Sequence, residues 1–296
     1  MSDLSSQSAI WGAWRALQAE TTNTPAGYAG HLRALLDLGL SWVDHADIYE
    51  DGRVESLHGE ALKADPGLAR ETRVITKCGV RFSSPGQPGV RVPHYRSDGD
   101  FIRASVEASL ERLGVEQIDL FLLHRPDYLM DPAETGEALD EMIRAGKIAA
   151  AGVSNFPLDR FDALAASMDD ELAAHQIELS VLHSSPLDDG GLLDAQMRGL
   201  PILAWSPLGG GALFGEGEAA QRLAPVLDEV AGRMGLAGRD AAALAWVKRC
   251  AGRVIPILGS CRQDRLCDQL AGLQAPEMEA QDWYALLQAG RGARIP

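Results

Sequence analysis

The sequence predicts an α/β protein folded as one (β/α)8 TIM barrel, a single domain over residues 1–296. Short apolar, β-branched runs alternate along the chain with segments of helical periodicity, which is typical of a parallel sheet covered by helices. Seven or eight such units favour a closed barrel over an open doubly wound sheet. The open sheet's GxGxxG turn after the first strand is also missing.

The expected strands are short apolar runs without strict alternation, as strands buried on both faces require. They lie at residues 40–46, 73–79, 118–124, 148–154, 173–179, 200–206 and 253–259, and an eighth is expected near 8–14. Helices are expected between them, at residues 25–39, 100–114, 131–147, 239–252 and 262–273. The first of these begins with Pro25 and ends with Gly39, the asymmetry that helix termini favour.

The composition is that of a globular protein, with 46% hydrophobic and 23% charged residues. The 27 Lys and Arg against 42 Asp and Glu give a net charge of −15. Such a chain repels nucleic acid and anionic membranes at long range, so we expect neither as a partner. Any anionic ligand must be held by a local cluster of donors.

The four cysteines, at positions 78, 250, 261 and 267, form no CxxC pair or metal-ligand spacing. We expect free thiols in a reducing compartment. The N-terminal residues lack a basic region followed by an apolar stretch, and no apolar run approaches 18 residues. These patterns predict a cytoplasmic protein.

Ionisable side chains end three consecutive predicted strands. Asp44, Lys77 and His124 each terminate or nearly terminate an apolar run, and Tyr49 follows Asp44 in the segment WVDHADIYEDG. In a barrel these ends meet at one mouth, where active sites are built. Taken singly, Asp44 could cap a helix, Lys77 could reach solvent and His124 could be a core histidine. Their coincidence favours a joint site.

These four residues suit proton transfer to a carbonyl oxygen. Asp44 keeps a buried Lys77 protonated, and the ammonium is expected to lower the pKa of Tyr49 from its usual value near ~10. Tyr49 would then act as general acid, and His124 would hold the carbonyl by a hydrogen bond. The competing metal site at His45, Asp47 and His58 is disfavoured because successive strand residues face opposite ways, so no metal is expected.

The same residues carry a resemblance to the aldo-keto reductase family, in particular to a bacterial branch of it. The motifs are DHADIY (44–49), VITKCG (74–79), DLFLLHRPD (119–127), GVSNF (152–156), QIELS (176–180), WSPLGGG (205–211) and IPILGSCRQDRL (255–266). They occur in the family's order and span about residues 8 to 270. The resemblance implies an oxidoreductase that reduces an aldehyde or ketone with NADPH, with Asp44, Tyr49, Lys77 and His124 as the catalytic residues.

The resemblance also implies a cofactor extended over the barrel mouth without a glycine-rich phosphate turn. The implied cofactor contacts are Gly12, Ala13, Trp14 and Asp44 near the ribose and substrate; Ser154, Asn155 and Gln176 at the nicotinamide amide; Trp205 under its ring; Ser206, Pro207, Leu208, Gly209, Gly210 and Gly211 over the pyrophosphate; Gly259, Ser260 and Arg265 at the 2′-phosphate; and Asp268 and Gln269 at the adenine.

Two departures from the family pattern bear on the choice of cofactor. Gly259 stands where many members have a lysine on the 2′-phosphate, and Asp268–Gln269 replaces a commoner Glu–Asn pair. Arg265 favours NADPH, and the use of NADH as well stays open.

Two other functions fit part of the pattern. Lys77 could form a Schiff base, as in class I aldolases, but that chemistry needs a neutral amine. The chain could also be a non-catalytic NADPH-binding regulatory subunit, like the barrel-shaped β subunits of potassium channels.

The resemblance implies that the small-molecule carbonyl substrate is chosen by loops at the barrel mouth, here 81–98, 126–131, 183–190 and 212–219. A monomer or a small homo-oligomer is expected.

Overall fold

The computed structural model describes residues 4–295 and has the predicted fold class. Eight strands form a closed barrel in the order β1-β10-β9-β8-β7-β6-β3-β2. Their bounds are β1 Ile10–Gly12, β2 Trp42–Asp44, β3 Arg73–Cys78, β6 Leu120–Leu123, β7 Ala151–Ser154, β8 His175–Glu178, β9 Ile202–Trp205 and β10 Val254–Leu258. Each lies inside one of the eight predicted runs, including the one expected near residues 8–14.

Eleven α-helices connect or follow these strands in the described part of the chain. They are α1 Pro25–Asp37, α2 Arg53–Ala64, α3 Leu68–Glu71, α4 Gly99–Leu113, α5 Pro132–Arg144, α6 Leu158–Ala165, α7 Gly191–Arg198, α8 Glu218–Met234, α9 Arg239–Lys248, α10 Gln263–Gln274 and α11 Ala280–Arg291. The five predicted helices correspond to α1, α4, α5, α9 and α10. Among residues 4–295, no helix is long and apolar enough to cross a membrane.

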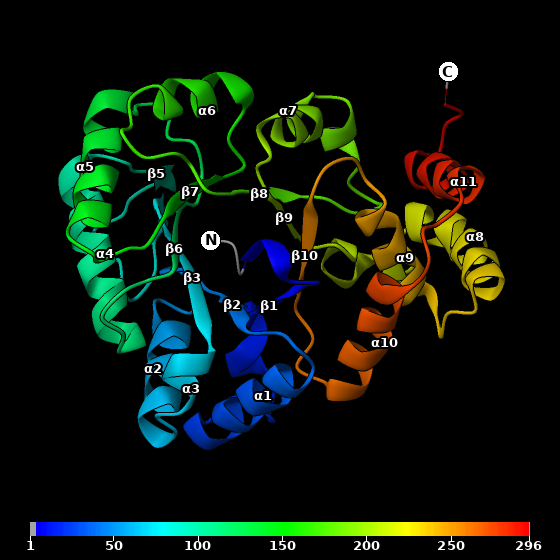
Figure 1. The fold of residues 1–296 in the computed structure, drawn as a ribbon, viewed down its shortest axis with the longest axis horizontal. Coiled ribbons are helices and arrows are strands. Elements are labelled where there is room, and N and C mark those ends of the chain that lie inside the picture. The colour runs from blue at the N-terminus through cyan, green and yellow to red at the C-terminus, as the bar shows by residue number, and fades with distance from the viewer. Residues whose placement is uncertain (1–3, 296) are drawn as a thin grey trace. The chain divides into compact units, whose positions relative to one another are not determined.

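The chain divides into two compact units. Of the described residues, the first unit contains Leu4 and residues 11–175, and the second contains residues 5–10 and 176–295. The single domain predicted over residues 1–296 stays a prediction. In the first unit, β1, β2, β3, β6 and β7 pair in parallel, with Gly12 opposite Asp44 and Lys77 opposite Leu122. Helices α2, α4 and α5 pack successively outside these strands (Figure 1).

The second unit has its own packed core around two tryptophans. Trp246 of α9 and Trp283 of α11 stack with ring centroids 5.0 Å apart and planes 6° from parallel. Each indole N–H donates to the other residue's carbonyl oxygen, at 3.0 and 3.2 Å. This satisfies both indole donors without water, so the last helix is tied firmly to α9. In the same unit α10 packs against α9 and α11 packs against α8.

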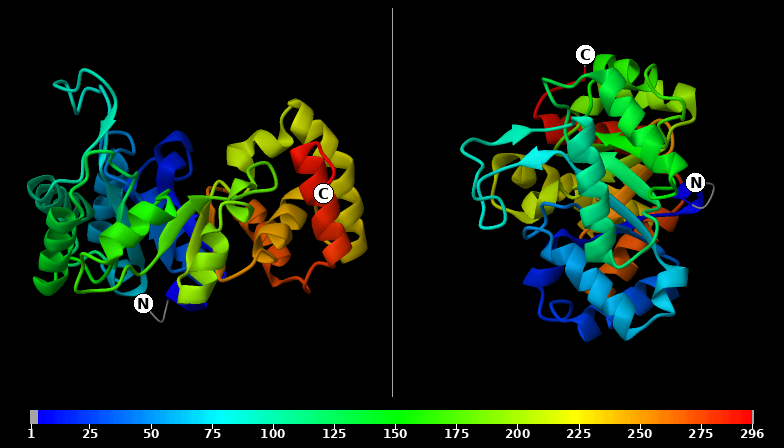
Figure 2. Two further views of the ribbon diagram at one scale, coloured as in Figure 1. Left: turned by 90° about the horizontal axis from the view of Figure 1, so that it is seen from above. Right: turned by 90° about the vertical axis from the view of Figure 1, so that its left-hand side faces the viewer.

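A small hairpin interrupts the strand–helix alternation after β3. Strands β4 (Val80–Arg81) and β5 (His94–Tyr95) pair antiparallel, with Val80 opposite Tyr95 and Arg81 opposite His94. The intervening turn projects from the first unit, as the cyan segment of Figure 2 shows. The sequence predicts only a long loop at 81–98, because two-residue strands carry no readable alternation.

The packing of α2 on α4 depends on a glycine. A Cβ added at Gly59 would overlap the carbonyl oxygen of Arg112 and crowd Leu113, both at the end of α4. That neighbour is backbone and cannot rotate aside, so a larger residue must push the two helices apart.

We expect Gly59→Ala to lower the free energy of unfolding by about 1–3 kcal/mol, because overpacking there outweighs the helix propensity of alanine. Gly30→Ala is the matched control, since a Cβ at that position on α1 meets nothing within 4 Å. It should be neutral or stabilise by up to ~1 kcal/mol. Urea unfolding followed by circular dichroism measures both. Equal effects of the two substitutions would contradict the proposed close packing.

Candidate active site

Lys77 lies at the centre of the candidate site. Its side chain is fully buried near the end of β3, and its ammonium has three acceptors within hydrogen-bond distance. Nζ donates to Asp44 Oδ2 at 2.8 Å, to the His45 carbonyl at 2.6 Å and to Tyr49 Oη at 3.3 Å. An ammonium has three N–H donors, so this set satisfies all of them.

The charge of Lys77 is maintained despite its burial. Desolvation lowers the pKa of the ammonium, but Asp44 and Tyr49 together raise it above its ordinary value. The Asp44 carboxylate is itself buried at the end of β2, so the two charges compensate each other inside the protein. The direction of this pKa shift agrees with the sequence prediction that Lys77 stays protonated.

Tyr49 differs from its prediction in one respect. The sequence predicts that the neighbouring ammonium lowers the pKa of the phenol, but burial raises that pKa above its usual value. Lys77 acts in the expected direction, and Asp44 acts against it. The prediction of a net lowering is therefore wrong, because desolvation of the phenolate outweighs the single nearby cation. The phenol thus stays protonated at neutral pH.

His124 lies at the end of β6, the barrel neighbour of β3, and its ring faces Tyr49. It follows β6 directly, its backbone N–H donates to the Cys78 carbonyl at 2.8 Å, and its ring centroid lies 6.4 Å from that of Tyr49 at 79°. Burial, with Lys77 and Arg125, holds the pKa of the imidazole well below its ordinary value, so the ring is neutral. Among the described residues, its buried Nδ1 has no hydrogen-bond partner. A neutral imidazole at this point can donate a hydrogen bond to a carbonyl oxygen.

The rings of His45 and His58 form a separate cluster with Tyr28. The His45 ring faces Tyr28 and His58, with Nε2 3.3 Å from Tyr28 Oη and 3.2 Å from His58 Nδ1. Burial lowers the pKa of both rings, that of His58 to about 4. Within residues 4–295, no three metal-binding side chains gather around a common point.

Asp47 forms a second buried electrostatic group with α2 and α4. Its Oδ1 is buried without a hydrogen-bond partner among the described residues. Nearby, the fully buried Glu55 accepts from Thr76 Oγ1 at 2.5 Å and from Arg112 Nε at 2.7 Å. Burial, reinforced by Glu55, raises the pKa of Asp47 to about 7, while Arg112 and Arg81 act against the rise.

The remaining predicted cofactor residues of the first unit follow strands β1 and β7. Gly12 ends β1, Ala13 is buried, and Trp14 is half exposed beneath the Arg15 guanidinium. Ser154 ends β7 fully buried, and Asn155, with φ of 57°, donates from Nδ2 to Ser154 Oγ at 2.7 Å. A left-handed backbone at a non-glycine residue is uncommon and is often found at functional sites.

In the second unit, residues 206–211 form an open backbone turn after β9. Ser206, Gly209, Gly210 and Gly211 all have positive φ, and a Cβ at Gly211 would meet nothing within 4 Å. Gly259 after β10 has the same open surroundings. The N–H groups of Gly209 and Gly211 donate to the Ser206 and Leu208 carbonyls within the turn, and the lack of side chains leaves room for a close approach to the backbone, which fits the predicted pyrophosphate contact. Gln176 is buried on β8, and Trp205 ends β9.

The first turn of α10 carries the predicted adenosine contacts. Arg262 is paired with Asp264, whereas Arg265 is exposed and has no carboxylate partner in the described chain. Ser260 Oγ accepts from the Arg262 N–H at 3.1 Å. Asp268 is exposed, but Gln269 is buried, and its Oε1 lacks a partner within residues 4–295. A free arginine and an unpaired amide oxygen fit a 2′-phosphate and an adenine amino group.

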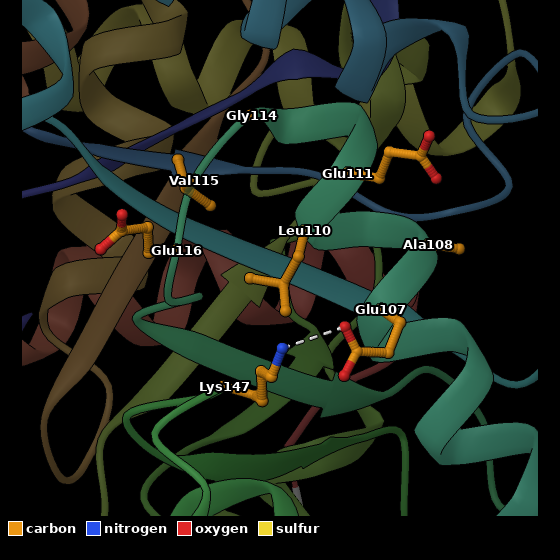
Figure 3. A pocket seen from close by; sticks show the side chains of 8 residues that line it. All are labelled: Glu107, Ala108, Leu110, Glu111, Gly114, Val115, Glu116 and Lys147. Atoms are coloured by element: carbon orange, nitrogen blue, oxygen red, sulfur yellow. Dashed lines mark hydrogen bonds and ion pairs between the residues drawn. The ribbon is translucent and has the colours of Figure 1, made fainter.

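A large cavity in the first unit lies away from Lys77 and His124. It has a volume of about 690 Å³ and is lined by Glu107, Ala108, Leu110, Glu111, Gly114, Val115, Glu116 and Lys147. As Figure 3 shows, its single cation, Lys147, pairs with Glu107 at 3.2 Å. These residues precede β6 and β7, at the amino ends of the strands, whereas Lys77 and His124 lie at the carboxyl ends. In barrels of this kind the chemistry lies at the carboxyl ends.

Comparison with known proteins finds a matching family and similar chains. Residues 10–289 match the sequence model of the Aldo/keto reductase family. The chain is 38% identical over 293 residues to a 6-dehydroglucose reductase of Novosphingobium aromaticivorans, covering 97% of this chain and 92% of that protein. It is 35% identical over 286 residues to the 6-dehydroglucose reductase of Agrobacterium fabrum, covering 97% and 95%.

A solved structure shares the fold. An aldo-keto reductase from Klebsiella pneumoniae, determined in complex with NADPH, superimposes with a TM-score of 0.77 at 24% identity. The match covers 97% of this chain and 92% of that one. The eight-stranded barrel is therefore an architecture that this chain shares with a reductase.

The raised pKa of Asp47 predicts a pH-dependent stability. Between pH ~4 and ~7 the folded state binds more protons than the unfolded state, so the free energy of unfolding falls as pH rises through this range. Asp47→Asn removes the charge, and we expect it to stabilise the protein at pH 8 by about 1 kcal/mol or more. The advantage should shrink toward pH 4. Urea titrations at both pH values measure it, with Asp37→Asn on α1 as the exposed control. A pH-independent difference from wild type would contradict the buried-carboxylate assignment.

Proposed function

The chain belongs to the aldo/keto reductase family, and from that premise we propose that it reduces a sugar-type aldehyde to the alcohol with NADPH, using Tyr49 as the proton donor. One observation carries this proposal. The Lys77 ammonium donates to both the Tyr49 hydroxyl and the Asp44 carboxylate, and the His124 ring lies nearly perpendicular to the Tyr49 ring. The sugar aldehyde is suggested by the names of two relatives that match over nearly their whole length.

The proton transfer follows from the charges of these residues. A bound reduced nicotinamide would supply two electrons and one hydrogen to the carbonyl carbon. The carbonyl oxygen then gains negative charge, and the Tyr49 hydroxyl gives it a proton. The resulting phenolate lies 3.3 Å from the Lys77 ammonium, which offsets its burial. Neutral His124 orients the carbonyl oxygen by a hydrogen bond before this transfer.

NADPH is the cofactor that this proposal requires, and three features support it. The open turn at 206–211 suits a pyrophosphate, Arg265 is available for the 2′-phosphate, and the Gln269 oxygen is available for the adenine. The NADPH complex of the Klebsiella pneumoniae protein agrees with this choice. Gly259 stands where many family members have a lysine, so this chain has one cation fewer at the 2′-phosphate. We therefore propose a preference for NADPH, with NADH as a weaker alternative.

The two other functions are less well supported. A Schiff base needs a neutral Lys77 with a free lone pair, but three acceptors hold the ammonium and its pKa is raised. A purely regulatory subunit would not need the phenol, the ammonium and the imidazole in one group. Steady-state turnover of an aldehyde separates an enzyme from such a subunit.

We expect Tyr49→Phe to lower the rate of aldehyde reduction by ~10²–10⁴, since it deletes the general acid and keeps the ring. NADPH affinity should be nearly unchanged, because the hydroxyl acts only when the carbonyl oxygen gains charge. Loss of NADPH absorbance with 4-nitrobenzaldehyde measures the rate, and cofactor fluorescence measures the affinity. Tyr284→Phe on α11 is the control for losing a hydroxyl. Wild-type turnover by Tyr49→Phe would refute this role.

Lys77→Met should impair the same step for a different reason. Removing the ammonium removes the nearby positive charge that lowers the phenol pKa, so Tyr49 becomes a weaker acid. It also leaves Asp44 as an uncompensated buried charge, which costs about 3–5 kcal/mol of stability. The double variant Asp44→Asn/Lys77→Met restores neutrality. It should recover much of the stability but none of the activity, as thermal unfolding and turnover will show.

The cofactor preference has its own test. Arg265→Ala should weaken NADPH binding about tenfold or more, because a charge-assisted contact contributes roughly 1.5–3 kcal/mol, and should leave NADH binding unchanged. Arg262→Ala, whose guanidinium is held by Asp264, is the matched control and should change NADPH binding less. Fluorescence titration gives both constants. Equal affinities for NADPH and NADH in the wild type would contradict the assignment of Arg265 to the 2′-phosphate.

A further inference from the structure

A cavity of about 460 Å³ lies on the β4–β5 hairpin. Its lining includes Arg81, Gly86, Gln87, Arg91, His94 and Arg96, and we call it the hairpin pocket. It contains three arginines and a histidine but no acidic residue, in a chain whose net charge is −15. The overall field of the protein repels anions, so a gathering of cations on one short segment needs a local explanation.

The arginines of the hairpin pocket are only partly neutralised by the protein. Arg96 is paired with Asp98, at 2.5 and 3.1 Å. For Arg81 and Arg91, no carboxylate lies within 4.0 Å anywhere in residues 4–295. Arg81 and Arg96 also both face the Phe101 ring, with Cζ 5.6 and 5.0 Å from its centroid. The two guanidinium groups thus face one ring, and only Arg96 has a carboxylate partner, while the charge of Arg81 also lowers the pKa of Asp47. Three arginines against these two carboxylates leave an excess positive charge that an anion would stabilise.

Gln87 adds an uncharged polar group to the hairpin pocket. Its Oε1 is buried and lacks a partner in the described structure. The two ends of a carboxamide exchange by rotation about the last side-chain bond, so this position can also present an N–H donor. The buried amide end otherwise has no partner, and an oxyanion bound among these arginines could accept a hydrogen bond from its N–H.

The hairpin pocket is attached to the catalytic group at two points. The backbone N–H of Arg96 donates to the Gly79 carbonyl at 2.8 Å, two residues after Lys77. Asp51, two residues after Tyr49, accepts from Ser84 Oγ at 2.5 Å and from the Gly86 N–H at 3.2 Å. The hairpin therefore follows directly from the strand of the ammonium and is bonded to the loop of the phenol. A molecule held in the pocket by one end is thereby kept beside the loop that carries Tyr49.

From these contacts we infer that the hairpin pocket binds an anionic group carried by the carbonyl substrate, a phosphate, sulfonate or carboxylate. This inference rests on the proposed reductase function and names the chemical class of its substrate. Arg81 and Arg91 supply planar donor pairs that match two oxygens of such a group, and the Gln87 amide supplies a neutral donor. The substrate is thus an aldehyde with an anionic group at the end away from the carbonyl.

The test uses a matched pair of aldehydes, glyceraldehyde and glyceraldehyde 3-phosphate. The wild type should reduce the phosphate compound with kcat/KM about tenfold or more above that of the neutral one. Arg81→Gln and Arg91→Gln should each lower kcat/KM for the phosphate compound about tenfold or more, and leave glyceraldehyde within about twofold. Arg144→Gln, an exposed arginine on α5, is the control for the loss of one charge and should change neither.

Inorganic phosphate distinguishes the source of the anion. It should inhibit reduction of glyceraldehyde 3-phosphate competitively, and this inhibition should disappear in Arg91→Gln. If phosphate binds the wild type but the phosphorylated aldehyde has no advantage, the pocket takes a free anion and the inference is wrong. A rise of the KM for NADPH in the Arg81 and Arg91 variants would assign the anion to the cofactor, which would also overturn the inference.

Failure of the proposed function gives a different result. If the wild type reduces glyceraldehyde and 4-nitrobenzaldehyde but shows no preference within the pair, only the anion site is refuted. If it reduces none of the three aldehydes with either NADPH or NADH, the reductase function is refuted and this inference falls with it.

Discussion

The buried ammonium of Lys77 is the constraint on which the rest of the site depends. A lone charge at this depth would cost several kcal/mol, and it is tolerated because three acceptors surround it. Two of them, Asp44 and the His45 carbonyl, come from the end of β2 and the residue after it. The third is the Tyr49 hydroxyl, whose raised pKa the ammonium partly lowers. A single cation therefore connects the ends of β2 and β3, the loop after β2 and the phenol that we propose as the proton donor.

Much of the fold could be predicted from the sequence, because buried parallel strands and capped helices leave strong local signals. All eight barrel strands lie inside apolar runs, and Asp44, Lys77 and His124 could be found as the polar residues at their ends. The hairpin of β4 and β5 could not, since four paired residues around a long polar turn show no periodicity. Nor could the His45 carbonyl, because backbone acceptors are not encoded by residue type.

The error over Tyr49 has a physical cause. Sequence shows which charges are near one another, but the cost of removing a phenolate from water depends on how completely the chain covers it. Here burial outweighs the ammonium, and the phenol is a weaker acid than the pairing alone predicts. Burial has the same effect on Asp47. In the sequence, the nearby His45 and His58 make it a possible metal ligand. In the structure it is a carboxyl with a pKa of about 7, beside the Glu55–Arg112 pair.

The contact of Asp51 with the hairpin has a consequence for how new specificities could arise in this scaffold. Surface loops of barrels are usually regarded as replaceable parts that change the substrate and leave the catalytic centre alone. Here Ser84 and Gly86 hold the left-handed turn at Glu50 and Asp51, which leads directly from Tyr49. The turn also has backbone hydrogen bonds of its own, such as that from the Gly52 N–H to the Tyr49 carbonyl at 3.2 Å, so a foreign hairpin without an equivalent of these two donors would weaken the turn and leave the Asp51 carboxylate without these partners. Exchange of the hairpin and the position of the loop that carries Tyr49 are therefore coupled, and a transplant should include both partners of the contact.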